Sequence, residues 1–319
     1  MHPVTKFYDT IRLSFPKVAF SFAYGSAVFK QLGRPLGHML DFIFAVDDPV
    51  SWHKQNLKWN STHYSFLRHL GAGSVVTVQS WAGQIYYNSL VEMNGKLIKY
   101  GVVSVHDMCH DLRHWNTLYV SGRLHKPVLM LEQAPPPMVS AAIATNLSMA
   151  VHSSLLMLPE KFSKEQLYTT IAGLSYQGDF RMIVGEDKNK VRNIVTPHLG
   201  EFHHLYSNTI NSDYISIGSD HIIQDKSTNA TVRHLTQLPS TIQDNLLRYT
   251  GLASFSEENV QRIAEDTSLP EHVHKSIKRV VARISLNQSL KGILTAGISK
   301  SVLYSGKKLQ KMKTSTVKK

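Results

Sequence analysis

Residues 20–49 read FSFAYGSAVFKQLGRPLGHMLDFIFAVDDP, and this stretch decides the fold that we expect for the first half of the chain. Phe20 to Tyr24 is a short apolar run, typical of a buried strand, and Gly25-Ser26 interrupts it as a turn. Residues 27–31 predict the start of a helix. Leu40 to Val46 is a second apolar run and predicts a second strand.

The same stretch also indicates a phosphate-binding site. A turn at Gly25-Ser26 lets backbone N–H groups approach triphosphate oxygens, and a helix N-terminus after it would add partial positive charge. Asp41 lies inside the second apolar run, where an unpaired buried carboxylate costs several kcal/mol. We therefore expect Asp41 to have a partner, and a Mg²⁺ that bridges phosphates suits this position. A plain structural turn at Gly25-Ser26 remains the alternative.

Charge is distributed unevenly along the 319 residues, which carry a net charge of +12. Residues 1–271 hold 23 basic and 23 acidic side chains, whereas 12 Lys and Arg and no acid follow Glu271. The basic character therefore belongs to the tail and favours an anionic surface as its partner. The single cysteine, Cys109, excludes an intramolecular disulfide and a multi-cysteine zinc site, which fits a reducing compartment.

No transmembrane helix is expected, because the longest uncharged run, residues 133–159, opens with three prolines and is rich in polar residues. The basic residues Lys6, Arg12 and Lys17 weakly resemble an organellar leader.

Residues 1–133 predict an α+β domain with a mixed sheet. A loop followed by a helix is expected over residues 47–71, with Tyr64, Phe66, Leu67 and Leu70 on the apolar face of that helix. A strand is expected over Val75 to Val78. Asn94-Gly95 between two apolar runs predicts a hairpin. A helix is expected over Asp111 to Arg123.

Three prolines after Ala134 predict a domain boundary, followed by a mostly helical domain over residues 134–270. Helices are expected over 139–158 and over 163–175, the second opening with the capping-box pattern of Ser163 and Gln166. Residues 214–224 predict a hairpin. Helices followed by a hairpin indicate a winged-helix-like domain.

Residues 271–319 predict a basic amphipathic C-terminal segment. Apolar residues recur at roughly helical spacing from Leu286 to Met312, and most lysines lie off that stripe. Such a segment can bind a membrane surface. A docked terminal helix with a solvated lysine tail is an equal alternative.

Several long segments, in order from about residue 20 to residue 310, resemble one family closely, the mitochondrial phosphatidate cytidylyltransferases of the translocator assembly and maintenance type. They include FAYGSAVFKQ, LDFIFAVDDPVSWHKQNL, WNTLYVSGRLHKPV, IAGLSYQGDFRMIVGEDKNKVRNIV and KGILTAGISKSVLYSGKKL. The resemblance implies synthesis of CDP-diacylglycerol and pyrophosphate from CTP and phosphatidic acid, with Mg²⁺. It also implies a peripheral protein on the matrix side of the mitochondrial inner membrane, whose product feeds cardiolipin synthesis. The implied fold is a nucleotidyltransferase domain, a winged-helix-like domain and a membrane-associating C-terminal segment.

The metal site departs from the wider nucleotidyltransferase superfamily, whose strand carries an Asp-x-Asp pair. Met39 and Ile43 stand where a partner of Asp41 would be. We expect the second ligand to be Asp179, because Gly178 before it and Arg181 after it suggest a backbone close to phosphate. An ion pair between Asp179 and Arg181 is the alternative.

The implied reaction needs positioning and charge neutralisation more than a strong base, since the attacking phosphate is already an anion. The candidate cations are Lys99, Arg123, Lys126, Arg181, Lys188 and Lys190. We assign catalysis to Asp41, Asp179, Arg181 and Lys188, and nucleotide binding to Gly25, Ser26, Lys99, Arg123 and Lys126. Two other functions stay open, a nucleotidyltransferase acting on nucleic acid and a non-catalytic assembly factor. A nucleic-acid partner is not expected, because the tail lacks interleaved aromatic residues.

Overall fold

The computed structural model describes residues 2–33, 36, 38–132, 134–184, 189–210, 215–218 and 221–296. The strands are β1 (Phe20–Tyr24), β2 (Met39–Val46), β3 (Ile85–Met93), β4 (Lys96–Ser104), β5 (Leu129–Met130), β6 (Lys161–Phe162), β7 (Ile215–Ile217) and β8 (Ile222–Gln224). The α-helices are α1 (Pro3–Ile11), α2 (Pro49–Trp59), α3 (Gly71–Ser80), α4 (Val105–His114), α5 (Ser121–Leu124), α6 (Pro137–Met157), α7 (Lys164–Gly173), α8 (Arg181–Val184), α9 (Lys190–Val195), α10 (Leu199–Ile210), α11 (Thr228–Thr236), α12 (Ser240–Thr250), α13 (Glu257–Ala264) and α14 (Leu269–Ala296). Short 3-10 helices are η1 (Arg12–Ser14), η2 (Ser61–His63), η3 (Phe66–Leu70), η4 (Leu174–Tyr176) and η5 (Thr196–His198).

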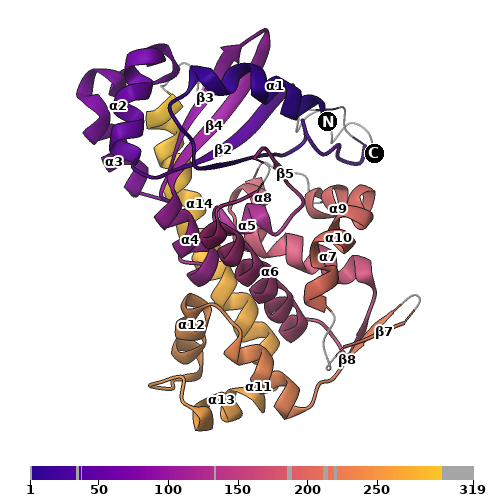
Figure 1. Cartoon of the computed structure of the whole chain (residues 1–319). Coiled ribbons are helices and arrows are strands. Elements are labelled where there is room, and N and C mark those ends of the chain that lie inside the picture. The colour runs from indigo at the N-terminus through magenta and orange to yellow at the C-terminus, as the bar shows by residue number, and fades with distance from the viewer. Residues whose placement is uncertain are drawn as a thin grey trace.

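The larger sheet lies at one end of the molecule and the helical part at the other, with α14 running along both (Figure 1). Its strand order is β3-β4-β2-β1-β5. β2 pairs with β4 in parallel, whereas the other neighbouring pairs are antiparallel, so the sheet is mixed. Asn94 and Gly95 connect β3 to β4 with φ of 46° and 72°. The α+β class, both strands of the opening stretch and this hairpin are therefore confirmed.

The two faces of the sheet are both covered, which fixes the direction of each side chain of β2. Phe42 and Phe44 pack with α1 on one face. Ile43 and Ala45 pack with α4 and the start of α6 on the other. By the same alternation Asp41 belongs to the second set, so its carboxylate lies on the face that looks toward the helices.

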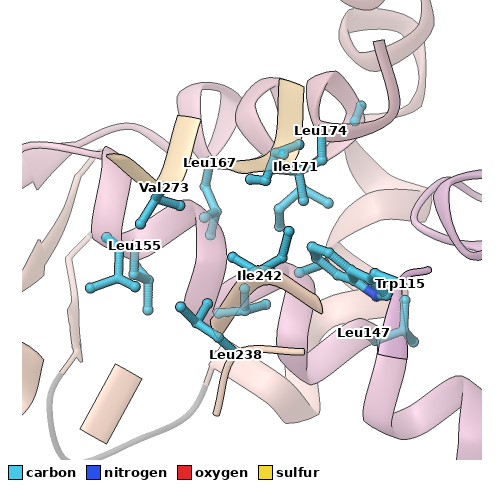
Figure 2. Close-up of a cluster of buried hydrophobic side chains, with 14 of the residues drawn as sticks. Trp115, Leu147, Leu155, Leu167, Ile171, Leu174, Leu238, Ile242 and Val273 are labelled. Carbon is cyan, nitrogen blue, oxygen red and sulfur yellow. The ribbon is translucent and has the colours of Figure 1, made fainter. Parts of the chain in front are cut away.

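The helical part has a core of its own around α6. Figure 2 shows side chains from α6, α7, α12 and α14 meeting there, among them Leu155, Leu167, Ile242 and Val273. α6 is long and apolar enough to cross a membrane by length and composition alone. Ten of its residues are buried in the protein, which is how the central helix of a packed core behaves.

The elements predicted for this part are confirmed where the structure describes them. α6 and α7 match the expected helices, and Ser163 and Gln166 form the predicted capping box. β7 and β8 form the predicted hairpin and join β6 in a small sheet.

The helix predicted to start at residues 27–31 is wrong, because this segment is a turn. The N–H groups of Val28 and Phe29 both donate to the carbonyl of Gly25. The chain does not continue as a helix, since the N–H of Leu32 instead donates to the carbonyl of Asn193. The segment is thereby held against α9.

The order of loop and helix predicted over residues 47–71 is wrong. α2 begins at Pro49, because Asp48 accepts hydrogen bonds from the N–H groups of Val50 and Ser51 and so caps the helix. The later residues form only the short 3-10 helices η2 and η3.

The strand predicted over residues 75–78 is also wrong, because these residues lie in α3. Val75 and Val78, three positions apart, are both buried in one small cluster with Tyr64 and Tyr86. Helical spacing of buried contacts therefore outweighs the β preference of the valines.

One buried carboxylate, that of Asp111, organises the chain between α4 and α5. It accepts six hydrogen bonds of 2.7–3.1 Å, from the N–H groups of Thr117, Leu118, Val120 and Ser121 and the hydroxyls of Thr117 and Ser121. The single helix predicted over residues 111–123 is therefore wrong. α4 ends at His114, and Trp115 takes a left-handed conformation with φ of 54°. Hydrogen bonds to a charged acceptor are stronger than the helical bonds that they replace.

The long helix α14 connects the helical part to the sheet. Val273, Ile277 and Val280 pack in the helical core, so the first part of the predicted segment 271–319 lies against the protein. Further along, the buried Lys291 donates from Nζ to the carbonyls of Gln79 at 2.8 Å and Ala82 at 2.5 Å. Burial lowers the pKa of Lys291 to about 7. Residues 297–319 lie outside the described residues.

Replacing Asp111 by Ala should destabilise the protein by about 3 kcal/mol or more, because buried N–H groups would lose a charged acceptor. Chemical unfolding followed by circular dichroism measures this loss. The matched control is Asp107→Asn in the same helix, whose carboxylate is partly exposed and bonds Ser104 at the helix start. The control should cost less than about 1 kcal/mol. Equal losses in both variants would contradict the role given to Asp111.

Candidate active site

A cavity of about 310 Å³ lies where the sheet meets the helical part. β1, β2 and β4 form one wall, α5 forms another, and η4 with α8, α9 and α10 form the rest. Its lining residues are Tyr24, Gly25, Phe29, Gln31, Asp41, Lys99, Leu118, Tyr119, Gly122, Arg123, Lys126, Pro127, Ser175, Tyr176, Asp179, Arg181, Lys190, Ile194, His198 and Phe202. Segments far apart in the sequence thus meet in one site.

The register of three neighbouring strands places polar side chains in a row on the sheet wall. Tyr24 pairs with Asp41 across β1 and β2, and Asp41 pairs with Lys99 across β2 and β4. Lys99 Nζ lies 3.8 Å from Asp41 Oδ1 and 4.3 Å from the centre of the Tyr87 ring. Asp41 therefore has a cation beside it, as its position inside an apolar strand predicted.

The surroundings of Asp41 make its ionised form costly. Burial raises the pKa of this carboxyl above its ordinary value, although Lys99 and Arg123 oppose the shift. The side chain is 22% exposed, and it lines the cavity. A cation bound in the cavity would stabilise the ionised carboxylate and lower this pKa.

Gly25 allows the turn after β1 to approach Asp41. Its φ is +85°, and a Cβ added to it would lie 3.2 Å from Asp41 Oδ2. A side chain here would therefore be strained and would press on the carboxylate. Ser26 lies in the same turn but is not among the residues that line the cavity.

The second predicted carboxylate, Asp179, is held by Arg181. The guanidinium donates from Nε to Oδ1 at 2.9 Å and from Nη2 to Oδ2 at 2.6 Å, and the Arg181 N–H donates to Oδ1 at 3.0 Å. Burial alone would raise the pKa of Asp179, but these contacts outweigh burial and the pKa lies below its ordinary value. The ion pair left open by the sequence is thus present, and a metal-binding role for Asp179 stays a prediction.

Gly178 sets the position of the loop that carries this ion pair. Its φ is +78°, and an added Cβ would lie 2.6 Å from the carbonyl oxygen of Lys278 in α14. The loop backbone therefore packs directly on the backbone of α14. The placement of Asp179 and Arg181 consequently depends on how α14 packs.

Two cations extend from α5 and the residues that follow it. The Arg123 guanidinium lies 3.9 Å from the centre of the Tyr119 ring and 5.3 Å from that of Tyr24. Lys126 donates from Nζ to Ser175 Oγ at 3.0 Å. Burial lowers the pKa of Lys126 to about 7, helped by the positive charges of Arg123 and Lys190. A group with this pKa changes charge near neutral pH.

Positive charge is in excess on the cavity wall. Five cationic side chains line it, Lys99, Arg123, Lys126, Arg181 and Lys190, against two carboxylates, Asp41 and Asp179. Burial would raise the pKa of the Tyr119 hydroxyl, but the cations outweigh burial and lower it. Such a cavity attracts a polyanion, and a nucleoside triphosphate has the required charge.

The donor set also fits Mg²⁺ in one particular way. No three His, Cys, Asp or Glu side chains gather as a metal site within the described part of the chain. Proteins commonly hold Mg²⁺ with one or two carboxylates together with water and substrate phosphates. Asp41 in a cavity lined by cationic side chains suits this arrangement.

The cavity brings together most of the residues singled out from the sequence. These are Gly25, Asp41, Lys99, Arg123, Lys126, Asp179, Arg181 and Lys190. Lys188 lies outside the described residues. Sequence reasoning missed the aromatic side chains against which the cations pack, those of Tyr24, Tyr119 and Tyr176. Tyr24 adjoins Gly25 and Tyr176 lies two positions before Gly178, so proximity to predicted site residues was the available signal.

A glycine turn after one strand, a carboxylate on the next strand and a cationic cavity are features typical of nucleotidyltransferases. The family model for mitochondrial phosphatidate cytidylyltransferase matches residues 8–311, and the chain belongs to this family.

Two vertebrate relatives with this name illustrate the similarity. The chain is 44% identical over 310 residues to the protein of Xenopus laevis, covering 93% of this chain and 92% of the relative. It is 46% identical over 318 residues to that of Danio rerio, covering 96% and 94%. A nucleotidyltransferase-like protein of Exiguobacterium sibiricum of known structure is 9% identical, with 91% and 77% covered and a TM-score of 0.25.

Gly25→Ala should weaken CTP binding about tenfold or more, because the new methyl group would displace Asp41 and the turn. Isothermal titration calorimetry measures the affinity. Gly33→Ala is the matched control, since Gly33 also has positive φ, +68°, but an added Cβ there would meet no atom within 4 Å. The control should bind CTP like the unmodified protein. Equal weakening in both would mean that backbone strain alone, rather than contact with Asp41, explains the effect.

The pKa of Lys126 predicts how binding of a phosphate anion depends on pH. The lysine is cationic below its pKa of about 7 and loses its charge as pH rises through that value. The affinity of the unmodified protein for pyrophosphate should therefore fall, relative to that of Lys126→Arg, between about pH 6 and pH 8. Titration of both proteins across this range tests the sign. A constant ratio of the two affinities would contradict it.

Proposed function

We propose that the chain transfers a cytidylyl group from CTP to phosphatidic acid and yields CDP-diacylglycerol and pyrophosphate. Its relatives are named phosphatidate cytidylyltransferase. The observation that carries the proposal is the cavity in which Asp41 lies among five cationic side chains. Two phosphate-bearing substrates repel each other, and they can meet only where their charge is neutralised.

In the proposed reaction a phosphate oxygen of phosphatidic acid attacks the α-phosphorus of CTP. A new P–O bond forms, the bond between the α-phosphorus and its bridging oxygen to the β-phosphate breaks, and pyrophosphate leaves with that electron pair. The attacking oxygen is already anionic, so the protein need not supply a strong base. Its contribution is to hold the two phosphates in line and to stabilise their charge.

The cationic side chains that would neutralise the phosphates lie on different walls of the cavity. Lys99 lies beside Asp41 on the sheet wall, whereas Arg123 and Lys126 extend from the α5 wall. Arg181, fixed by its pairing with Asp179, presents its charge from the third wall. Asp41 would hold Mg²⁺ together with phosphate oxygens, and the ion, when bound, supplies positive charge at the reacting phosphates. Phosphates placed between these walls would be surrounded by positive charge.

The relatives are named as mitochondrial proteins. We propose further that this chain acts at the matrix side of the inner membrane as a peripheral protein, and that its product supplies cardiolipin synthesis. The absence of acidic residues after Glu271, with 12 Lys and Arg in the same stretch, supports attraction of the C-terminal segment to anionic lipid.

The test is an assay with purified protein, Mg²⁺, phosphatidic acid liposomes and CTP labelled with ³²P at either the α or the γ position. The α label should appear in a lipid-soluble product, and the γ label should appear only in pyrophosphate. Asp41→Asn should lower turnover by about a hundredfold or more while leaving thermal stability equal or slightly higher, because a poorly solvated charge is removed.

The control for this variant is Asp9→Asn, which removes an exposed carboxylate that pairs with Arg12 on the surface. It should keep full activity. The proposed function fails if the folded protein gives no lipid-soluble α label. The role of Asp41 fails if folded Asp41→Asn turns over normally.

A further inference from the structure

A group of large apolar side chains is exposed on the unit formed by α2, η3 and α3, which packs beside β3 and β4. Trp59, Phe66, Leu70 and Trp81 are each between 52% and 60% exposed, and we call these four residues the apolar corner. They come from the end of α2, from η3 and from the residue after α3, and α3 packs on both α2 and η3. Large apolar residues exposed within one packed unit mark an interaction surface.

The charge of this unit indicates what it binds. Between Asp48 and Glu92 the chain contains no acidic residue. Its basic residues Lys54, Lys58 and Arg68 are all exposed. The surface therefore combines tryptophans with positive charge, and no carboxylate of its own segment offsets that charge.

A second acid-free segment adjoins the first. Buried Lys291 ties α14 to the end of α3 through the carbonyls of Gln79 and Ala82, and Figure 1 shows α14 ending beside α2 and α3. Leu286 and Leu290 on this part of α14 are more than half exposed. No acid follows Glu271, and the 23 residues after Ala296 contain seven lysines. The exposed leucines of α14 therefore lie at the same end of the molecule as α2 and α3.

We propose that the apolar corner, with Leu286 and Leu290 of α14 at the same end of the molecule, is a second membrane-docking surface that binds an anionic lipid bilayer. Tryptophan is enriched at the boundary between lipid and water, and Lys and Arg beside it attract anionic headgroups. A second copy of the chain is disfavoured as the occupant, because two such faces carry charge of the same sign. The inference rests on the proposed function in one respect, that the lipid substrate requires the enzyme to work at a bilayer.

The docking surface is separate from the cavity. None of the four residues of the apolar corner lines the cavity. α2 packs through Trp52 on the face of the sheet that carries Phe42 and Phe44, whereas the Asp41 carboxylate lies on the other face. Docking should therefore govern how much protein is bound to the bilayer, and chemistry on a substrate dissolved in water should not depend on it.

Intrinsic fluorescence tests this in the full chain. Of the four tryptophans Trp52 and Trp115 are buried, so Trp59 and Trp81 are the two that can respond to lipid. Vesicles of phosphatidylcholine and cardiolipin should shift the emission to shorter wavelength, and brominated acyl chains should quench it. Pure phosphatidylcholine vesicles should act much more weakly, and Trp59→Phe/Trp81→Phe should abolish the response.

Vesicle flotation tests the energetic contribution. Trp59→Ser/Phe66→Ser/Trp81→Ser should lower partitioning to the anionic vesicles about tenfold or more. Lys58→Gln/Arg68→Gln should lower it about fivefold for each charge removed. The matched control is Ile223→Ser/Tyr249→Ser, which removes exposed apolar side chains from the helical part. Activity on phosphatidic acid in vesicles should fall with binding, whereas activity on water-soluble dihexanoyl phosphatidic acid should stay unchanged.

Unchanged flotation of the triple serine variant overturns the proposal. A second result would also overturn it. If acrylamide does not quench Trp59 and Trp81 before vesicles are added, and deletion of residues 297–319 restores the quenching, then the chain itself covers the corner. Concentration-dependent dimerisation lost in the triple variant would assign the corner to a second copy instead. Failure of the proposed function would give a different result. The unmodified protein would then not turn over dihexanoyl phosphatidic acid, whatever the flotation experiment shows.

Discussion

Six hydrogen bonds to the Asp111 carboxylate fix the conformation of the chain between α4 and α5. They thereby position α5, which forms one wall of the cavity. Without this acceptor, the buried N–H groups of residues 117–121 would have to find other partners. Val120 and Leu124 pack on the sheet from this segment, so Arg123 between them is carried along toward the cavity. A carboxylate outside the cavity thus positions a cation within it.

The walls also rest on close approaches that only glycine allows. Gly25 brings the turn after β1 against Asp41, Gly122 lets α5 approach Ser175, and Gly178 seats its loop on α14. At each of these positions a Cβ would come within 3.2 Å of a neighbouring atom. The site is therefore made of close contacts among the sheet, α5, η4 and α14. Fixed charges in such a site neutralise a polyphosphate without having to rearrange, which is the condition for electrostatic catalysis.

Prediction from sequence succeeded where the signal was local. The strands of residues 20–49, the hairpin at Asn94-Gly95 and the capping box of Ser163 each depend on neighbouring residues, and all three are confirmed. It failed where a distant group changed the local preference. Residues 27–31 form a turn and do not continue as a helix, because the N–H of the following residue Leu32 donates to the carbonyl of Asn193. The helix that contains Asp111 ends early because the Asp111 carboxylate accepts hydrogen bonds from the backbone N–H groups that follow it.

The sequence by itself determined the α+β class, the two strands that carry Gly25 and Asp41, the charge of the candidate residues and the membership of a family. Tertiary structure alone decided which of these charges meet. Asp41 is flanked by Lys99 through strand register, and Asp179 is engaged by Arg181 rather than left open toward the cavity. The physical reason is that hydrogen-bonding patterns and apolar periodicity act over a few residues, whereas burial and Coulomb interactions depend on distance in space. Only the fold brings α14 beside α3, so that two acid-free segments lie next to each other. No local sequence pattern predicts that contact.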